Sequence, residues 1–386
     1  MSSPIDAIRA YAPELTALRH DFHTHPEIGM EEHRTAGIVA QKLAEWGIEV
    51  HQGVGRTGVV GVLKRGDGPS IGLRADMDCL PMHEQTNLEY RSRTPGRMHA
   101  CGHDGHTAML LGAAKYLAAS GDFKGTVNFI FQPGEEGMGG ALAMLEDNIF
   151  DRFPCDFIFA MHNRPGMAVG TYAISPGPSA AGGAFFDITV NGRGAHGARP
   201  EGSIDPVLTA AHITTALQSI VARNVAPSDT AVLSVTRIVG GDAYNVIPQS
   251  AVISGTARAF RREVMAQMED GMKRVATGVA AGFGATADVD FRVIFAPLIN
   301  DVAQTDAIAD AAASLVGEAA VDRAKPPGMG SEDFSFMMEK VPGAYIQVGN
   351  GDSAQLHNPA YNFNDEATPF GAGLLATLVE RKLAKA

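Results

Sequence analysis

Three histidines, a cysteine and an aspartate lie within nine residues of this chain, residues 98–106 (MHACGHDGH). Imidazole and thiolate are the usual protein ligands of zinc and other late first-row divalent metals. The glycines permit a tight turn, which lets neighbouring side chains converge on one point. Taken alone, the spacing of Cys101 and His103 is more typical of a solvated polar loop. A metal site therefore requires ligands from elsewhere in the chain.

Further candidate ligands follow two apolar runs, and one lies near the end of the chain. Glu136 follows residues 126–131, and His162 follows residues 156–161. The complete candidate set is Cys101, His103, Glu136, His162 and His357. Five ligands are too many for one tetrahedral metal but suit two metals that share a bridging group, and a thiolate can bridge. We predict two divalent cations per chain, with Zn, Mn, Co and Ni all compatible with this ligand set.

Two carboxylates beside these ligands can have other roles. Glu135 is adjacent to Glu136, and in a bend one of two adjacent carboxylates can bind metal while the other faces a metal-bound water. Glu135 would then act as general base and afterwards as general acid toward the leaving amine. Asp76, at the end of residues 70–75, can orient an imidazole ligand through its second nitrogen. For Glu135 and Glu136 in isolation, a solvated turn is the alternative.

The elements that must position these residues form an α/β pattern. Apolar runs predict strands at residues 57–63, 70–75, 126–131, 156–161 and 345–348. Hydrophobic periodicity predicts helices at residues 4–24, 33–46, 107–119, 306–320, 331–339 and 366–384. Continuous apolar runs are typical of parallel strands buried on both faces. Ligands of open α/β sheets bind beyond the carboxyl ends of the strands, where Asp76, Glu136 and His162 are expected.

The pattern changes at about residue 183. Four strands and two helices then follow in the order β-α-β-β-α-β, which is the split, ferredoxin-like motif. We therefore predict a catalytic domain made of residues 1–182 and 297–386, interrupted by an inserted α+β domain at residues 183–296. A length of 386 residues agrees with two domains.

Composition limits the possible partners. A formal net charge of −12 repels phosphate backbones, so we expect no nucleic-acid partner. We find no secretory signal and no apolar run long enough to span a bilayer, so we expect no membrane association. Three widely spaced cysteines argue against a disulfide framework. These features favour the reducing cytoplasm.

Several motifs resemble those of the M20 metallopeptidase family, most closely its aminoacylase/hippurate hydrolase branch. They are residues 73–78 (LRADMD), 98–106, 132–136 (QPGEE), 161–163 (MHN) and 329–334 (MGSEDF). The resemblance implies a zinc-peptidase-like catalytic domain with a central mixed sheet flanked by helices. It also implies that the inserted domain is a lid and dimerisation domain. The implied activity is metal-dependent hydrolysis of N-acyl amino acids, such as hippurate-like amides, to a carboxylic acid and a free amino acid.

The resemblance also implies roles for single residues. Cys101 would bridge the two metals, Glu136 and His357 would complete one site, and His103 and His162 the other. Glu135 would be the catalytic base.

In the inserted domain, His196 would stabilise the oxyanion in a neighbouring subunit of a homodimer or homotetramer. Asn245 and Arg258 would contact the substrate carboxylate. From the residues alone, His196 is more typical of a turn histidine and Arg258 of a surface charge.

Other functions remain open. A dipeptidase, a carboxypeptidase or an N-acetyl-diaminopimelate-type deacetylase would use the same chemistry, because the ligands do not determine the pocket walls. A more remote alternative is a catalytically silent metal-binding protein. A nucleotide-dependent enzyme is not favoured, since the chain lacks a Walker-type loop.

Overall fold

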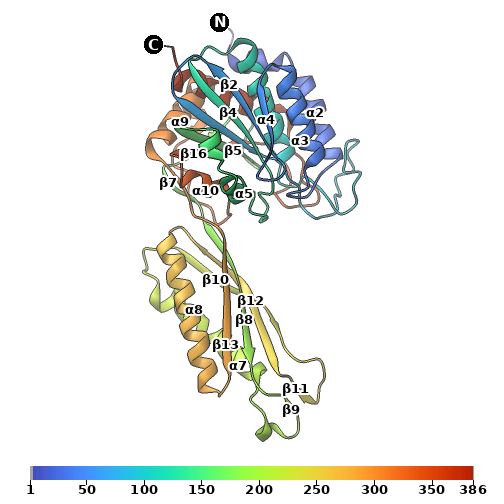
Figure 1. The fold of residues 1–386 in the computed structure, drawn as a ribbon, viewed down its shortest axis with the longest axis vertical. Coiled ribbons are helices and arrows are strands. Elements are labelled where there is room, and N and C mark those ends of the chain that lie inside the picture. Colours follow the sequence, from blue (N-terminus) through green and yellow to red (C-terminus); the bar gives the residue numbers. More distant parts are fainter. Residues whose placement is uncertain (1–2, 386) are drawn as a thin grey trace. The chain divides into compact units, whose positions relative to one another are not determined.

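The structure, a computed structural model, describes residues 3–385 and divides into two compact units (Figure 1). The larger unit comprises the chain up to Ser179, Ile299–Pro326 and the chain from Asp333 onward. The smaller unit comprises Ala180–Leu298 and Pro327–Glu332. The expected insertion, residues 183–296, lies within this smaller unit, whereas residues 327–332 were expected in the catalytic domain.

An eight-stranded mixed sheet forms the centre of the larger unit, in the order β1-β2-β4-β3-β5-β16-β6-β15. Neighbours β4, β3, β5 and β16 are parallel, so their carboxyl ends lie at the same edge. The strands are β1 (Glu49–Val54), β2 (Gly58–Arg65), β3 (Ser70–Asp76), β4 (Gly125–Gln132), β5 (Phe157–Arg164), β6 (Tyr172–Ala173), β15 (Val321–Asp322) and β16 (Gly343–Gly349). The mixed α/β sheet predicted from the sequence is confirmed.

Helices surround this sheet. They are α1 (Pro4–Arg9), α2 (Ala12–Thr24), α3 (His33–Glu45), α4 (His103–Ser120), α5 (Gly140–Glu146), α6 (Ile149–Arg152), α9 (Val302–Val316), α10 (Phe334–Met338) and α11 (Thr368–Lys382). Helix α4 contacts β3, α2 and α11 and is buried on nearly every side, which explains its small apolar residues. The same helix carries His103 in its first turn.

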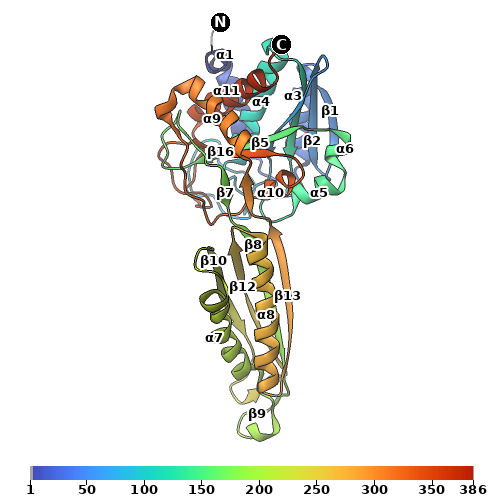
Figure 2. The same ribbon diagram turned by 90° about the vertical axis from the view of Figure 1, so that its left-hand side faces the viewer.

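The smaller unit has a four-stranded antiparallel sheet in the order β10-β12-β8-β13. Its elements are β8 (Gly182–Asn191), α7 (Pro206–Asn224), β10 (Ala231–Val239), β12 (Ser250–Ala259), α8 (Arg262–Gly282) and β13 (Thr286–Phe295). Helices α7 and α8 pack together on one face of the sheet (Figure 2). This is the expected β-α-β-β-α-β order, and apolar side chains of both helices and the sheet form a core of its own.

Short strands complete the description. Strands β9 (Ala195–His196) and β11 (Val246–Ile247) form a two-stranded sheet beyond the ends of β8 and β12 (Figure 1). Strands β7 (Gly177–Ala180) and β14 (Leu298–Asn300) form another.

Three predicted boundaries were wrong in ways that concern the site. The helix expected at residues 107–119 begins earlier, at His103, so this residue does not lie on a loop. The strand expected to end at residue 161 continues to Arg164 and includes His162. The helix expected at residues 4–24 is broken between α1 and α2 shortly before Pro13. Proline has no N–H to donate to the carbonyl of Arg9, four residues earlier, and its ring would clash with that carbonyl.

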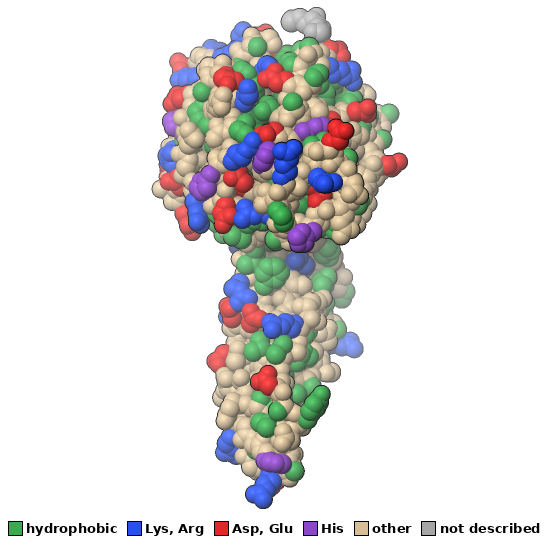
Figure 3. Space-filling model, turned by 90° about the vertical axis from the view of Figure 1, so that its right-hand side faces the viewer, with side chains coloured by type: hydrophobic (Ala, Val, Ile, Leu, Met, Phe, Trp, Pro, Cys, Tyr) green, Lys and Arg blue, Asp and Glu red, His purple; other side chains and the backbone are tan. Residues whose placement is uncertain are grey.

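Basic and acidic side chains are interspersed over the face of the molecule in Figure 3. Within residues 3–385, no helix combines the length and the apolar character that a bilayer crossing requires.

Candidate metal centre

The carboxyl ends of three parallel strands bring the predicted residues to one edge of the sheet. Asp76 ends β3 and pairs in register with Gln132, which ends β4. Glu135 and Glu136 lie in the turn that follows β4, and His162 lies near the end of β5. Residues more than eighty positions apart in sequence therefore become neighbours, as the parallel order requires.

Helix α4 supplies the next two candidates at its N-terminus. Gly102 precedes the helix with φ at 92°, in the left-handed region where glycine carries no steric cost. A Cβ atom at this position would lie 2.4 Å from the Asn163 side-chain oxygen. The tight turn at Gly102 places Cys101 and His103 beside the strand ends, with Cys101 Sγ 3.3 Å from His162 Nε2.

His357 comes from a long irregular segment near the C-terminus. Its backbone N–H donates to the Ala100 carbonyl at 2.8 Å, and its φ of 61° is uncommon for a residue other than glycine. This conformation brings Nε2 of His357 within 3.2 Å of Glu136 Oε1.

The side chains form two overlapping groups with metal-ligand geometry. Cys101, His103 and His162 offer ligand atoms within 4.8 Å of one another, and so do Cys101, Glu136 and His357. Cys101 belongs to both groups, as a bridging ligand must. Glu135 also lies within this distance of His103 and Glu136, and it is buried. All five predicted ligands and the predicted base therefore converge.

Two ligand atoms indicate that cations fit this site. His103 Nε2 and Glu136 Oε1 are buried, and neither makes a hydrogen bond of good geometry among residues 3–385, although His357 Nε2 lies 3.2 Å from Glu136 Oε1. Buried polar atoms without partners are costly in a folded protein, and metal coordination removes that cost. The two atoms are 4.0 Å apart.

The electrostatics of the cluster also favour positive charge. Burial, and then the Glu136 carboxylate, raise the pKa of the Cys101 thiol, so its thiolate needs cations nearby. Burial alone would lower the pKa of His103, but Asp76 and Cys101 raise it well above its usual range. Burial lowers the pKa of His162, which keeps this ring in the neutral form that binds metals.

Asp76 and Asp78 hold different histidines. Asp78 Oδ1 lies 3.2 Å from Nδ1 of His103, and its Oδ2 accepts the Glu136 backbone N–H at 3.0 Å. Asp76, which was expected to orient a ligand, instead lies 2.6 Å from Nδ1 of His106. Asp78 therefore orients one candidate ligand and fixes the backbone of another.

Sequence reasoning missed both Asp78 and His106. The spacing of Asp76 and Asp78 at a strand end could have indicated Asp78, since residues two apart in a strand lie on the same face. The spacing of His103 and His106 becomes a signal only when the helix is known to begin at His103, because residues three apart then lie on one helical face.

Arg74 supplies a buried positive charge behind the cluster. Its guanidinium donates to Asp76 Oδ2 at 2.7 Å and to Asp333 at 3.1 Å. Burial would raise the pKa of Asp76, but His103, His106 and Arg74 hold it well below its usual range. Asp76 is therefore an anion.

The remaining predicted residues lie in the smaller unit, at two ends of its sheet. His196 is exposed in β9 and pairs with Val246, so Asn245 lies next to it. Arg258 is half-buried in β12 and pairs with Gly183 near the other end of β8. The nine residues from Ser250 to Arg258 are separated by eight steps, which span roughly 27 Å of extended strand. Within one chain, Asn245 and Arg258 are therefore too far apart to bind one carboxylate.

The sequence matches the model of peptidase family M20/M25/M40 over residues 72–381. It is 42% identical over 371 residues to a hippurate hydrolase of Campylobacter jejuni, covering 96% of this chain and 97% of the relative. It is 40% identical over 375 residues to an N-acetylcysteine deacetylase of Bacillus subtilis, covering 96% and 97%.

Among solved structures, the chain is similar to a Bacillus subtilis protein described as a dinuclear metal-binding peptidase of the M20 family. The TM-score is 0.85 and the sequence identity is 36%, with 98% of this chain and 100% of the other covered. The match therefore spans both units of this chain. The chain belongs to the M20/M25/M40 peptidase family.

Proposed function

We propose that this protein is a metal-dependent amidohydrolase that cleaves N-acyl amino acids to a carboxylic acid and a free amino acid. The observation that carries the proposal is the convergence of the five predicted metal ligands and one further buried carboxylate, Glu135, near the ends of parallel strands. Relatives named for the hydrolysis of hippurate and the deacetylation of N-acetylcysteine support this substrate class.

Cys101 would bind both cations, Glu136 and His357 one of them, and His103 and His162 the other. Bound there, the cations would polarise the amide carbonyl and lower the pKa of a water molecule. Glu135 would accept a proton from the attacking water and then deliver it to the leaving nitrogen. Asp78 would keep His103 in one orientation during these steps.

Arg258 would bind the carboxylate of the substrate, because a guanidinium pairs with a carboxylate in two parallel hydrogen bonds. His196 would stabilise the oxyanion, and Asn245 would contact the substrate beside it. Since Asn245 and Arg258 lie at opposite ends of one sheet, the two residues around one substrate would come from two copies of the chain.

The free edges of this sheet differ in a way that supports a homodimer. Strand β13 exposes Asp288, Asp290 and Arg292, and charges of this kind protect an edge from pairing. Strand β10 instead exposes the apolar side chains of Ile238 and Val239, with one charged residue, Arg237, beside them. We infer that β10 lies in the dimer interface.

We also infer that the protein works in a reducing compartment such as the cytoplasm, which would keep the thiol of Cys101 reduced.

The test is a panel of N-acyl amino acids in which the acyl and amino-acid parts vary separately. The protein is first stripped of metal and then loaded with Zn²⁺, Mn²⁺, Co²⁺ or Ni²⁺. We expect release of free amino acid from hippurate-like amides, and none from the metal-free protein. No turnover with any loaded form, or preferential cleavage of unblocked dipeptides, would contradict the proposal.

A further inference from the structure

Arg19 of α2 is fully buried and binds two carboxylates at once. Its Nη1 donates to Asp104 Oδ2 at 3.1 Å, and its Nε and Nη2 donate to the two oxygens of Asp365 at 2.5 and 3.1 Å. The rings of Tyr90 and Phe363 lie 4.8 and 5.7 Å from the guanidinium carbon. The planar guanidinium suits this arrangement, because it presents several donors in fixed directions.

The two carboxylates belong to the two chain segments that carry ligands. Asp104 directly follows His103 in the first turn of α4. Asp365 begins the 3₁₀ helix Asp365–Ala367, eight residues after His357. A single side chain from helix α2 therefore joins the segments of two candidate ligands that lie more than 250 positions apart in sequence.

The segment that carries His357 depends on such contacts. Residues 350–364 form neither helix nor strand, so ordering them costs conformational entropy that only tertiary contacts offset. The Tyr361 hydroxyl pairs with the Asn163 amide, and the Phe363 ring packs against Gly105 of α4. The Arg19–Asp365 pair fixes the end of the segment.

We propose that Arg19 is a positioning residue of the metal centre. By holding Asp104 and Asp365 together, it sets the spacing of His103 and His357, and thereby the affinity for the pair of cations. This inference rests on the proposed two-cation function. A purely structural Arg19 would affect folding alone. The inference requires in addition that loss of its ion pairs weakens metal binding in the folded protein.

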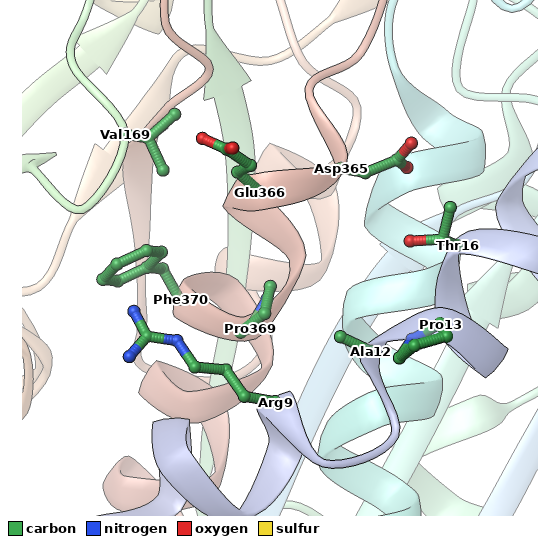
Figure 4. A pocket seen from close by; sticks show the side chains of 9 residues that line it. All are labelled: Arg9, Ala12, Pro13, Thr16, Val169, Asp365, Glu366, Pro369 and Phe370. Atoms are coloured by element: carbon green, nitrogen blue, oxygen red, sulfur yellow. The ribbon is translucent and has the colours of Figure 1, made fainter.

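The two carboxylates differ in how much removal of their charge is expected to disturb the fold. Asp104 is completely buried, and its Oδ1 has no hydrogen-bond partner among the described residues. Asp365 is 27% exposed and lines a pocket of about 780 Å³, with Thr16 and Glu366 beside it (Figure 4). Asp365→Asn is therefore a mild variant that removes charge from one end of the arrangement.

The experiment titrates metal-free, full-length protein with Co²⁺ in competition with a chromophoric chelator. Absorption of the cobalt–thiolate bond reports on Cys101. The variants are Arg19→Lys, Arg19→Met and Asp365→Asn. The control is Arg65→Met, because Arg65 donates to Ala118 and Gly121 at the other end of α4 and stacks over Phe123 in a similar way.

We expect two Co²⁺ ions per wild-type chain and a 10- to 100-fold weaker affinity in Arg19→Met, the order typical of groups that support ligands. The Co²⁺ affinity of Arg19→Lys should lie between those of the wild type and Arg19→Met, since an ammonium keeps the charge but cannot reproduce the bidentate pair with Asp365. Asp365→Asn should weaken binding less than Arg19→Met and should add little when combined with it. Arg65→Met should bind Co²⁺ like the wild type.

Wild-type affinity in folded Arg19→Met, or an equal loss in Arg65→Met, would overturn the inference. If Arg19→Met does not fold, unchanged affinity in Asp365→Asn would overturn it instead. If the wild-type chain binds fewer than two Co²⁺ ions, the proposed function itself is overturned. This outcome is distinct from failure of the Arg19 inference, because it is measured on the wild type alone.

Discussion

Glu135 and Glu136 are adjacent, and Oε1 of Glu136 lies 4.0 Å from His103 Nε2 and 3.2 Å from His357 Nε2. We expect Glu135→Gln to lower kcat by at least ~10²–10⁴-fold, the contribution of general acid–base catalysis, while both cations stay bound. Glu136→Gln should lose metal as well as activity. Elemental analysis beside steady-state kinetics separates the two outcomes. Substantial turnover in Glu135→Gln would remove this residue from the proton transfer.

Cys101 is the one residue shared by both ligand groups. Cys101→Ser should lower the affinity for both cations, because a serine hydroxyl is a poor bridging anion. Cys155→Ser is the matched control, since Cys155 is also a free thiol but lies two residues before β5, away from the strand ends that carry the ligands. Metal content after equilibrium dialysis is the measurement. Two cations retained in Cys101→Ser would contradict the bridging role.

His23 gives the fold a pH dependence of its own. Burial would lower the pKa of His23, but the Asp104 charge and hydrogen bonds to Asp104 and Glu84 raise it to about 9. Because this value lies above the unfolded value of about 6.5, the stabilisation is complete below pH 6.5 and is lost as pH rises through 9.

We expect this loss to be roughly 3 kcal/mol of unfolding free energy in total. Urea unfolding of wild type and His23→Gln between pH 6 and 10 measures it. The difference between the two proteins should shrink as pH rises. A constant difference would exclude a protonated His23 in the native state.

The sequence indicated the residue types of the site better than their orientation. Thiolate, imidazole and carboxylate groups at strand ends predict convergence because parallel strands share an edge. The partner of each imidazole could not be predicted, since it depends on side-chain direction. For this reason Asp76 was expected beside a ligand, whereas Asp78 lies there.

At the scale of elements, the start of α4 depends on a close approach between two segments. A Cβ atom on Gly105 would lie 2.2 Å from the Phe363 ring, so α4 and the segment carrying His357 can meet only at a glycine. Gly105→Ala should cost about 1–3 kcal/mol by overpacking and should weaken metal binding, because it displaces the segment of His357.

Gly278→Ala is the control, since the structure has open space there and α8 lies in the smaller unit. Thermal unfolding of the metal-free proteins and Co²⁺ titration give the two readouts. A Gly105→Ala variant that loses stability but keeps wild-type metal affinity would contradict the coupling.

Where the hydrophobic periodicity was strong, the sequence predicted whether a segment is a helix or a strand. It predicted the first and last residues of these elements less well. The helix expected at residues 306–320 begins at Val302 because the Asp301 side chain accepts the Gln304 N–H, a capping signal that precedes the periodic residues. Strands β6, β9, β11 and β15 have two residues each, too few to show a period. Strand β6 pairs with the longer β16, whereas β9 and β11 pair with each other, so their formation depends on the loops that carry them.

For the whole molecule, the two ends of the small sheet lead us to expect a dimer. If His196 and Asn245 of one chain serve the site of another, Ile238→Glu on β10 should give a monomer with low kcat/KM but two bound cations. Val293→Glu, on the exposed part of the opposite edge strand β13, should remain a dimer with normal activity. Sedimentation equilibrium and elemental analysis give the measurements.

Complementation between inactive chains tests the sharing of sites directly. A Glu135→Gln chain keeps His196, and a His196→Ala chain keeps Glu135, so a mixed dimer contains one complete site. Random reassociation of equal amounts should restore about a quarter of the wild-type activity, since half of the dimers are mixed and each has one working site of two. The unmixed variants should stay inactive under the same conditions. No recovery from a mixture shown to contain mixed dimers would place both groups in one chain, which the length of the sheet between Arg258 and Asn245 argues against.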